Sequence, residues 1–393
     1  MIGEQEPMPF HRPLLGEEEV KEVIAVLESG WLTTGARVVA FEREFGDVIG
    51  SSALALSSGT AALHLGLIVA GVGPGDVVVT TPYTFCSTVH VIEQVGARPL
   101  FVDVERDTLN IDVSAVAAAV EDSGEAVKAV LPVHIAGQPC DMDPMLELAK
   151  THGLALVEDA AHAFGAAHRG RPVGQVEPGL VHTVAFSFYA TKNITTGEGG
   201  MLSGEPALLE EARRWSLHGI SRDAWHRNNV GGAWRYDVLC AGFKYNMPDL
   251  LAALGRVQLG RSDDMLRRRH EVAHAYTAAF GELPELDVPI ARPGTRHAWH
   301  MYLLRLVLPR LSVTRDEFIA ELNAAGIGTS VHFIPIHHLR YYRDRYDFDG
   351  ADFSVTDAEF ERVLSLPIYP AMTDGDVERV VAAVRSVVRR HRR

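Results

Sequence analysis

The stretches that decide the fold read LALVEDAAHA at residues 154–163 and TVAFSFYATKN at residues 183–193. Each begins with an apolar run of strand length and ends in side chains that can carry chemistry. Similar apolar runs alternate with helix-like stretches from Val77 to Ser203. This alternation predicts βαβ units, that is, a parallel sheet covered by helices on both faces. Sites in such sheets lie at the carboxyl ends of the strands.

The pattern predicts the positions of individual elements. Strands are expected over five apolar runs: 77–80, 98–102, 126–132, 154–158 and 183–188. Helices are expected over 87–95 and 142–152, and a long helical stretch over 248–274. Beyond it the pattern changes to short strands and helices, at 302–308, 314–325 and 374–390. Since 393 residues exceed what one core usually supports, we predict a large domain over 1–262 and a smaller α+β domain over 263–393.

Composition excludes several classes of protein. Asp and Glu outnumber Lys and Arg by 51 to 37, and the net charge of −14 disfavours nucleic-acid binding. No apolar run approaches the roughly 18 residues that cross a bilayer. The acidic N-terminus without a signal-like apolar stretch predicts a cytoplasmic protein. The three cysteines are too far apart for a disulfide framework or a CxxC metal site. The terminal RRHRR is expected to complement the dipole of a final helix.

The segment SFYATKN places Lys192 shortly after the end of a predicted strand. A lysine at the carboxyl end of the strands can form an imine with an aldehyde cofactor. If the lysine pKa is lowered, the freed amine can then carry protons. A solvated loop lysine is the alternative.

Two carboxylates, Glu158 and Asp159, stand where another predicted strand ends. Pyridoxal phosphate (PLP) is an electron sink only while its pyridine nitrogen is protonated, and a buried carboxylate keeps it so. Strand alternation points the two carboxylates to opposite faces of the sheet, so only one of them can face the pyridine nitrogen. The alternative for Asp159 is a cap on the following helix.

A third feature resembles a phosphate cradle. Ser57, Ser58 and Gly59 precede a helix-forming stretch, whose free amides and dipole attract a dianion, and Thr60 adds a hydroxyl. Ser187 can add another. The fourth feature is the aromatic Phe85 after a strand, which can stack on a pyridine ring or belong to the core. Together the four features indicate PLP.

These segments resemble the DegT/DnrJ/EryC1/StrS family of sugar aminotransferases, which have the aspartate aminotransferase fold (PLP fold type I). The resemblance covers nearly the whole chain, through SGWLTTGARVVAFEREF, SSGTAALHLGL, TPYTFCST, VEDAAHAFGA, SFYATKNITTGEGG, GFKYNMPDLLAALGRVQL, HAWHMYLLRL and GIGTSVHFIPIHHLRYY. It implies an α/β large domain with a mostly parallel seven-stranded sheet between helices.

The resemblance also implies roles for individual residues. Lys192 would hold PLP as a Schiff base, and Asp159, rather than Glu158, would face the pyridine nitrogen. Phe85 would stack on the ring and His162 would lie beside it. The remaining cofactor residues would contact the phosphate: Gly59, Thr60 and Ser187 in one chain, and Asn246 from a neighbouring subunit. A homodimer with shared active sites follows, and higher oligomers stay open.

The implied reaction moves an amino group from glutamate, through pyridoxamine phosphate, to a keto group on a nucleotide-linked sugar, and releases 2-oxoglutarate. The SRDAW and KYNM segments resemble those of family members that aminate C4, and this resemblance favours C4 of a dTDP- or UDP-4-keto-6-deoxyhexose or 4-keto-pentose over C3. An aminocyclitol substrate, a PLP-dependent sugar dehydratase and a non-enzymatic regulator are the other readings.

Substrate contacts are expected from side chains outside the cofactor set. Trp31, Thr33 and His332 are candidates for the sugar pocket, and the candidate cations for the nucleotide are Arg222, Arg227 and Lys244. The histidines His332, His337 and His338 could instead suggest a metal. No metal is expected, because no carboxylate or cysteine in the sequence pattern completes a ligand set.

Overall fold

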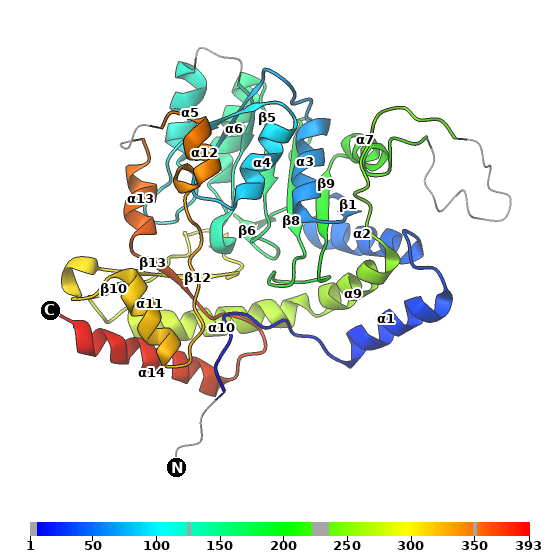
Figure 1. The fold of residues 1–393 in the computed structure, drawn as a ribbon. Coiled ribbons are helices and arrows are strands. Elements are labelled where there is room, and N and C mark those ends of the chain that lie inside the picture. The colour runs from blue at the N-terminus through cyan, green and yellow to red at the C-terminus, as the bar shows by residue number, and fades with distance from the viewer. Residues whose placement is uncertain (1–5, 124–126, 222–235, 349–351) are drawn as a thin grey trace.

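The largest element of the computed structural model is a seven-stranded sheet (Figure 1). Residues 6–123, 127–221, 236–348 and 352–393 are described. In spatial order the strands are β1 (Ser52–Leu56), β9 (Gly200–Gly204), β8 (His182–Ser187), β5 (Ala155–Asp159), β4 (Val127–Leu131), β2 (Val77–Thr80) and β3 (Arg98–Phe101). Only β9 runs against its neighbours. The predicted α/β class with a mostly parallel sheet is confirmed.

Helices cover both faces of this sheet, because successive strand residues point to opposite sides. In β8, Ala185 packs into one core while Val184 and Phe186 pack into another. One face is covered by α3 (Gly59–Val69), α4 (Cys86–Gln94) and α7 (Pro206–Ser216). The other is covered by α2 (Ala36–Ile49), α5 (Val113–Asp122), α6 (Met142–His152) and α9 (Asp249–Gly260). The inner strands β2, β5 and β8 are therefore buried on both sides, as expected.

The long helical stretch predicted over 248–274 is wrong in detail. It consists of two helices, α9 and α10 (Ser262–Phe280), which meet at Arg261. The Arg261 guanidinium donates to Glu19 of α1 (Glu17–Ser29) at 2.7 Å. The residue at the break therefore contacts a helix far back in the chain, which local sequence does not reveal.

A second core lies in the C-terminal part of the chain. Its three-stranded antiparallel sheet contains β10 (Leu286–Asp287), β12 (Tyr302–Leu306) and β13 (Val363–Leu366). The helices here are α10, α11 (Arg315–Ala324), α12 (Arg340–Arg345), α13 (Ser354–Phe360) and α14 (Asp374–His391). The predicted strand over 302–308 ends earlier, at Leu306, and Met8 also joins this core. The domain boundary near residue 262 stays a prediction.

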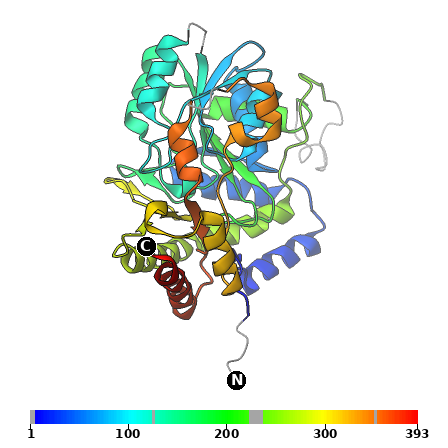
Figure 2. The ribbon, with the colours of Figure 1, turned by 60° about the vertical axis from the view of Figure 1, so that its left-hand side comes forward.

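Short strands connect the two parts of the molecule. They form a third sheet, of β6 (Ala167–His168), β7 (Arg171–Pro172) and β11 (Thr295–Arg296). In both ribbon views (Figures 1 and 2) most of the C-terminal part, coloured yellow to red, lies below the large sheet, whereas α12 and α13 rise alongside it. The segment that carries them therefore spans both parts.

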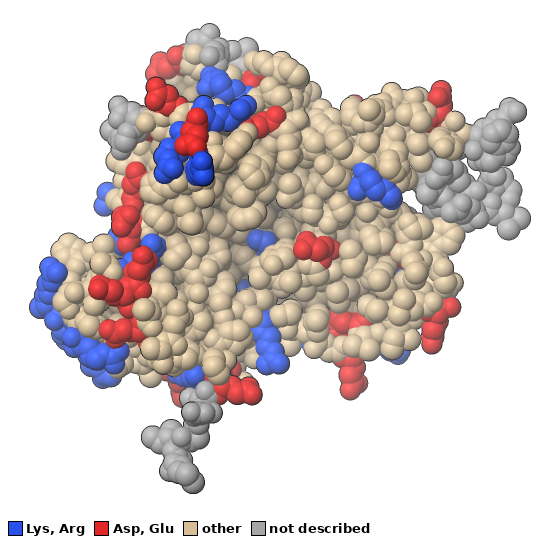
Figure 3. All heavy atoms as spheres, in the orientation of Figure 1, with Lys and Arg blue, Asp and Glu red and all other residues tan. Residues whose placement is uncertain are grey.

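The surface fits an acidic protein with local ion pairs. The basic end of the chain lies on α14, where Arg390 pairs with Glu321 and Arg392 pairs with Glu285, as expected for a helix end. On the face shown in Figure 3, acidic side chains lie beside this basic group. Among the described residues no helix has the length and apolar character to span a bilayer.

Candidate active site

A cavity of about 460 Å³ lies where the carboxyl ends of β5 and β8 meet the N-terminal ends of α3 and α4. Most of the residues predicted for the site line it: Gly59, Thr60, Phe85, Asp159, His162, Ser187, Lys192 and His332. These residues come from five separate segments of the sequence. The parallel sheet brings them together because its strands end at one edge.

Lys192 follows β8 in a turn closed by its own backbone N–H, which donates to the carbonyl of Tyr189 at 2.9 Å. Its side chain lines the cavity, and burial lowers its pKa to about 8, against the opposing attraction of the Asp159 carboxylate. An amine with this pKa is available near neutral pH both as a nucleophile and as a proton carrier. Its place in the cavity contradicts the alternative of a solvated loop lysine.

Asp159 ends β5 and is held in one orientation by two hydrogen bonds. The Thr88 hydroxyl donates to Oδ2 at 2.8 Å, and the backbone N–H of Ala161 donates to Oδ1 at 3.1 Å. Burial raises the pKa of Asp159, while the two hydrogen bonds and the charge of Lys192 oppose that rise. A buried carboxylate fixed in this way fits a cationic partner placed in the cavity.

Glu158 points to the opposite face of the sheet and does not line this cavity. Its carboxylate accepts hydrogen bonds from Nε2 of His134 at 2.6 Å and from Nε2 of His182 at 2.5 Å. Backbone N–H groups of Cys140 and Glu177 donate to the Nδ1 atoms of these histidines, so both imidazoles carry their proton on Nε2. Burial raises the pKa of Glu158, but the two histidines outweigh it and keep the pKa low. Sequence reasoning did not find this buried triad.

The predicted phosphate cradle is the N-terminus of α3. Ser58 caps the helix through a hydrogen bond from the Ala61 amide at 3.0 Å, and the amides of Gly59 and Thr60 are among the first of the helix, which have no acceptor within it. A Cβ on Gly59 would lie 2.8 Å from the Ser187 Cβ. Glycine is therefore needed for the close approach of this helix end to the end of β8.

Aromatic rings form one wall of the cavity. Phe85 precedes α4, is 57% exposed and lies 5.9 Å from the Phe333 ring. His162 is stacked between His300, at 4.5 Å, and Phe333, at 5.6 Å. Among the described residues its buried Nδ1 has no hydrogen-bond partner, and burial lowers its pKa well below the usual value. A neutral imidazole with a free nitrogen can bind a polar ligand atom here.

Phe10 and His11 are among the cavity residues that were missed in the sequence. The backbone just before these two residues pairs with the segment at Gly326, because the Met8 N–H donates to the Gly326 carbonyl at 2.9 Å. Phe10 then stacks on His332 with centroids 5.4 Å apart, and the His11 ring lies 3.1 Å from the Ala190 carbonyl. No local signal marks these residues, because the contact spans most of the chain.

Three predicted residues lie outside the cavity of their own chain: Trp31, Thr33 and Asn246. They lie close together instead. Asn246 Nδ2 donates to the Thr34 hydroxyl at 2.7 Å, and Trp31 Nε1 donates to the Thr34 carbonyl at 3.1 Å. Lys244 hydrogen-bonds to Asn246 Oδ1. We call Trp31, Thr33, Thr34, Lys244 and Asn246 the asparagine cluster.

The remaining candidates are the two arginines proposed for the nucleotide and the three histidines considered for a metal. Arg222 and Arg227 lie outside the described residues. The argument that no carboxylate completes the histidine group is wrong, because Asp357 meets both His337 and His338. His332 is not part of that group, since its Nδ1 lies 2.8 Å from the Ser365 hydroxyl and its ring lines the cavity.

The fold and the cavity together define an aminotransferase-type site, with a lysine and a carboxylate at the ends of adjacent parallel strands beside a glycine-led helix. The model of the DegT/DnrJ/EryC1/StrS aminotransferase family matches residues 13–385, and the chain belongs to this family. The predicted family and enzyme class are confirmed.

Individual relatives support this placement. The chain is 47% identical to the Spore coat polysaccharide biosynthesis protein SpsC of Bacillus subtilis (strain 168), over 97% of both chains. It matches Spr1654 of Streptococcus pneumoniae in the PMP-form with a TM-score of 0.89 and 31% identity, covering 98% of this chain and 99% of the other. It also matches PseC of Helicobacter pylori, an aminotransferase involved in the biosynthesis of pseudoaminic acid, with a TM-score of 0.87 and 25% identity over 98% and 100% of the two chains.

Proposed function

We propose that this chain uses PLP held by Lys192 to move an amino group from glutamate to a nucleotide-linked keto sugar. The observation that carries the proposal is the pairing of Lys192 and Asp159 across one cavity. Their pKa values are shifted toward each other by burial, lowered for the amine and raised for the acid. Such opposed shifts are typical of groups that handle protons in catalysis.

The predicted cofactor agrees with the comparisons and with the cavity. Spr1654 is known in a PLP-form and a PMP-form, and both share this fold, with TM-scores of 0.88 and 0.89. In this chain a dianion fits the amides at the start of α3, and a cationic ring nitrogen fits the buried Asp159. PLP, when bound, supplies an aldehyde that takes up the amino group and a ring that accepts electrons.

The chain's own residues have distinct tasks in this reaction. Lys192 would hold the cofactor through its amine and would move a proton to and from the carbon that loses or gains the amino group. Asp159, which the Thr88 hydroxyl holds in place, would stabilise a positive charge on the ring nitrogen of the cofactor. Phe85 would stack on the ring and His162 would lie beside it, and both would limit the access of water to the reacting face.

A sugar is proposed as amino acceptor because of the relatives. SpsC is named for polysaccharide biosynthesis, and PseC for the biosynthesis of pseudoaminic acid. C4 of a dTDP- or UDP-4-keto-6-deoxyhexose or 4-keto-pentose remains our preferred acceptor. Lys244 supplies a cation at the edge of the asparagine cluster, and burial lowers its pKa from the usual value. A cytoplasmic location remains a prediction.

The alternatives are less well supported by the cavity. A PLP-dependent dehydratase of this family has a histidine in place of the lysine, whereas this chain has Lys192. A non-enzymatic regulator would not need the hydrogen bonds that orient Asp159 beneath an open cavity. A C3 keto sugar and an aminocyclitol stay open as acceptors.

The direct test uses the PLP-loaded protein with glutamate and a panel of acceptors. The panel contains dTDP- and UDP-linked 4-keto and 3-keto sugars together with a free keto-cyclitol. We expect 2-oxoglutarate and a 4-amino sugar nucleotide, identified by mass spectrometry and NMR. Turnover of the cyclitol alone would overturn the proposal, and amination at C3 would correct its position.

We further propose a homodimer in which the asparagine cluster of one chain completes the site of the other. The cluster lies outside its own cavity, although the family resemblance assigns Asn246 to the phosphate. Nearby, α1 carries Val20, Ile24 and Leu27 on one face, each about half exposed, as a stripe that needs a partner surface. The exposed Phe85 also fits a site that a second chain covers.

Subunit mixing tests this arrangement. Lys192→Ala and Asn246→Ala chains are each expected to be severely impaired. In a heterodimer of the two, one site has both variants and the other has neither. Random exchange makes half the dimers heterodimers, so the mixture should recover about a quarter of the parent activity.

The control pairs Lys192→Ala with Asp159→Asn, two residues that line the same cavity of one chain. Each heterodimer site then carries one lesion, so no recovery is expected. Verified exchange without recovery in the first mixture would exclude the shared site.

A further inference from the structure

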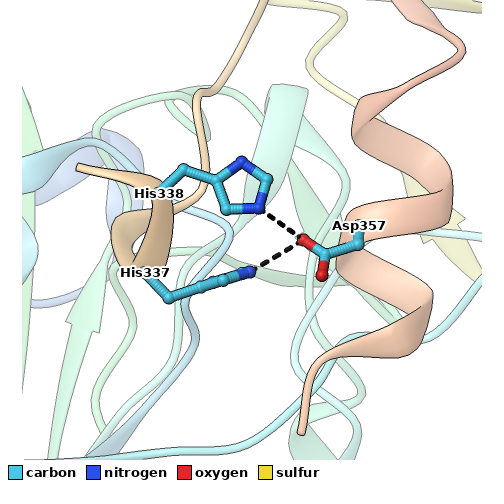
Figure 4. Close-up of side chains that lie close together, drawn as sticks. All are labelled: His337, His338 and Asp357. Carbon is cyan, nitrogen blue, oxygen red and sulfur yellow. Dashed lines mark hydrogen bonds and ion pairs between the residues drawn. The ribbon is translucent and has the colours of Figure 1, made fainter. Parts of the chain in front are cut away.

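Two histidines and one aspartate converge at a point outside the active-site cavity. His337 and His338 lie on the short 3-10 turn η3 (Ile336–His338), and Asp357 lies on α13. Nε2 of His337 is 2.7 Å and Nε2 of His338 is 2.9 Å from the same atom, Oδ1 of Asp357 (Figure 4). The two imidazoles therefore point at one carboxylate oxygen from one side.

This donor set is typical of a transition-metal site. Two imidazole nitrogens and one carboxylate oxygen, with one position left for water, are a frequent zinc arrangement. The three candidate ligand atoms lie within 4.8 Å of one another. Tetrahedral zinc with bonds of about 2.0–2.2 Å separates its ligand atoms by roughly 3.3–3.5 Å. The two nitrogen–oxygen distances, 2.7 Å and 2.9 Å, therefore need to open by about half an ångström.

The surroundings allow that change and hold the imidazoles in place. The side chains of His338 and Asp357 are each 35% exposed, which gives water access to a fourth position. The ring of His337 lies 4.8 Å from Phe353, and that of His338 lies 5.4 Å from Phe360. Aromatic packing on both histidines limits the rotamer freedom that metal binding would otherwise have to remove.

We propose that His337, His338 and Asp357 bind one divalent transition-metal ion of the zinc class, which clamps η3 to α13. The turn is anchored to the loop that follows β2 of the large sheet, since Ile336 N–H donates to the Pro82 carbonyl at 2.8 Å. The helix is anchored too, since the Asp103 carboxylate accepts from backbone N–H groups at the start of α13. The ion thus stabilises the segment that comes after Phe333, a residue of the cavity wall. Its role is structural, because none of its ligands lines the cavity.

The test measures binding of Zn²⁺ and Co²⁺ to the chelator-treated, PLP-loaded protein. Calorimetry with Zn²⁺ should give one ion per chain at this site, and Co²⁺ should give the visible absorption of a tetrahedral complex. Zn²⁺ should also raise the melting temperature. His338→Asn and Asp357→Asn replace half-exposed ligands, so the variants should fold. Each should weaken binding at least as much as loss of an outer-shell partner does, about 10–100-fold.

Matched controls separate this site from others. Asp344→Asn removes a nearby exposed carboxylate, and His152→Asn removes an exposed histidine elsewhere; both should bind as the parent does. Parent protein without saturable binding would show that the three side chains hold one another by hydrogen bonds alone. Unchanged binding in Asp357→Asn, or binding lost only in His332→Asn, would place the ion elsewhere and overturn the proposal. None of these readouts depends on aminotransferase activity.

Discussion

Replacement of Lys192 by alanine is expected to abolish transamination. The loss of proton transfer alone predicts a fall in kcat of about 10²–10⁴-fold, and the covalent link is lost as well. The half-reaction with glutamate, followed through the absorbance of bound PLP, is the measurement. Borohydride reduction and peptide mapping should place the cofactor on Lys192 in the parent and on no lysine in the variant.

Two controls make this result specific. Lys192→Arg keeps the positive charge beside Asp159 but cannot form the covalent link, so it should be as inactive as the alanine variant. Lys150→Ala removes a half-exposed lysine paired with Glu177 and should leave the rate unchanged. An active Lys192→Arg variant would mean that charge, rather than covalent chemistry, is the function of this residue.

Replacement of Asp159 by asparagine is expected to have the second largest effect. The amide keeps the size of the side chain, but it removes the charge that stabilises a protonated ring nitrogen in a buried place. Loss of one preorganised electrostatic contact of this kind predicts a fall in kcat of about 10²–10³-fold. Rates of the glutamate half-reaction and the absorption spectrum of bound PLP across pH would both change.

A structural role of Asp159 would give a different pattern. If its only task were to hold the backbone at Ala161, Asp159→Asn would lower the melting temperature and leave the pH dependence of the bound spectrum unaltered. Asp264→Asn changes an exposed carboxylate on α10, paired with Arg267, and should affect neither measurement.

Much of the fold was predictable because it is encoded locally. The strands at β2, β3, β4, β5 and β8 are mostly apolar, and each was predicted to within about two residues, as was α6. β1 and β9 were not placed individually, because SALAL and GMLSG are short and rich in small residues. The break between α9 and α10 was missed because Gly260, which directly precedes Arg261, is a weak signal, since an isolated glycine is tolerated within a helical pattern.

The residues of the candidate site also divide into those that local sequence predicted and those that only the structure could assign. Lys192, Asp159 and Gly59 were predicted because each follows a strand or begins a helix, and parallel strands end at one edge. Strand alternation left Glu158 and Asp159 as alternatives. The structure separates them, since Glu158 meets two histidines that are each 24 positions away.

The sequence by itself determined the fold class and placed Lys192 and the carboxylates Glu158 and Asp159 at strand ends, because periodicity and strand-end chemistry are properties of short segments. Its motifs also indicated the family. Only the tertiary structure decided that Phe10 and His11 reach the cavity, that the asparagine cluster lies outside it, and that Asp357 meets His337 and His338. The physical reason is that these contacts depend on which distant segments the packed cores bring together. No local pattern in the chain carries that information.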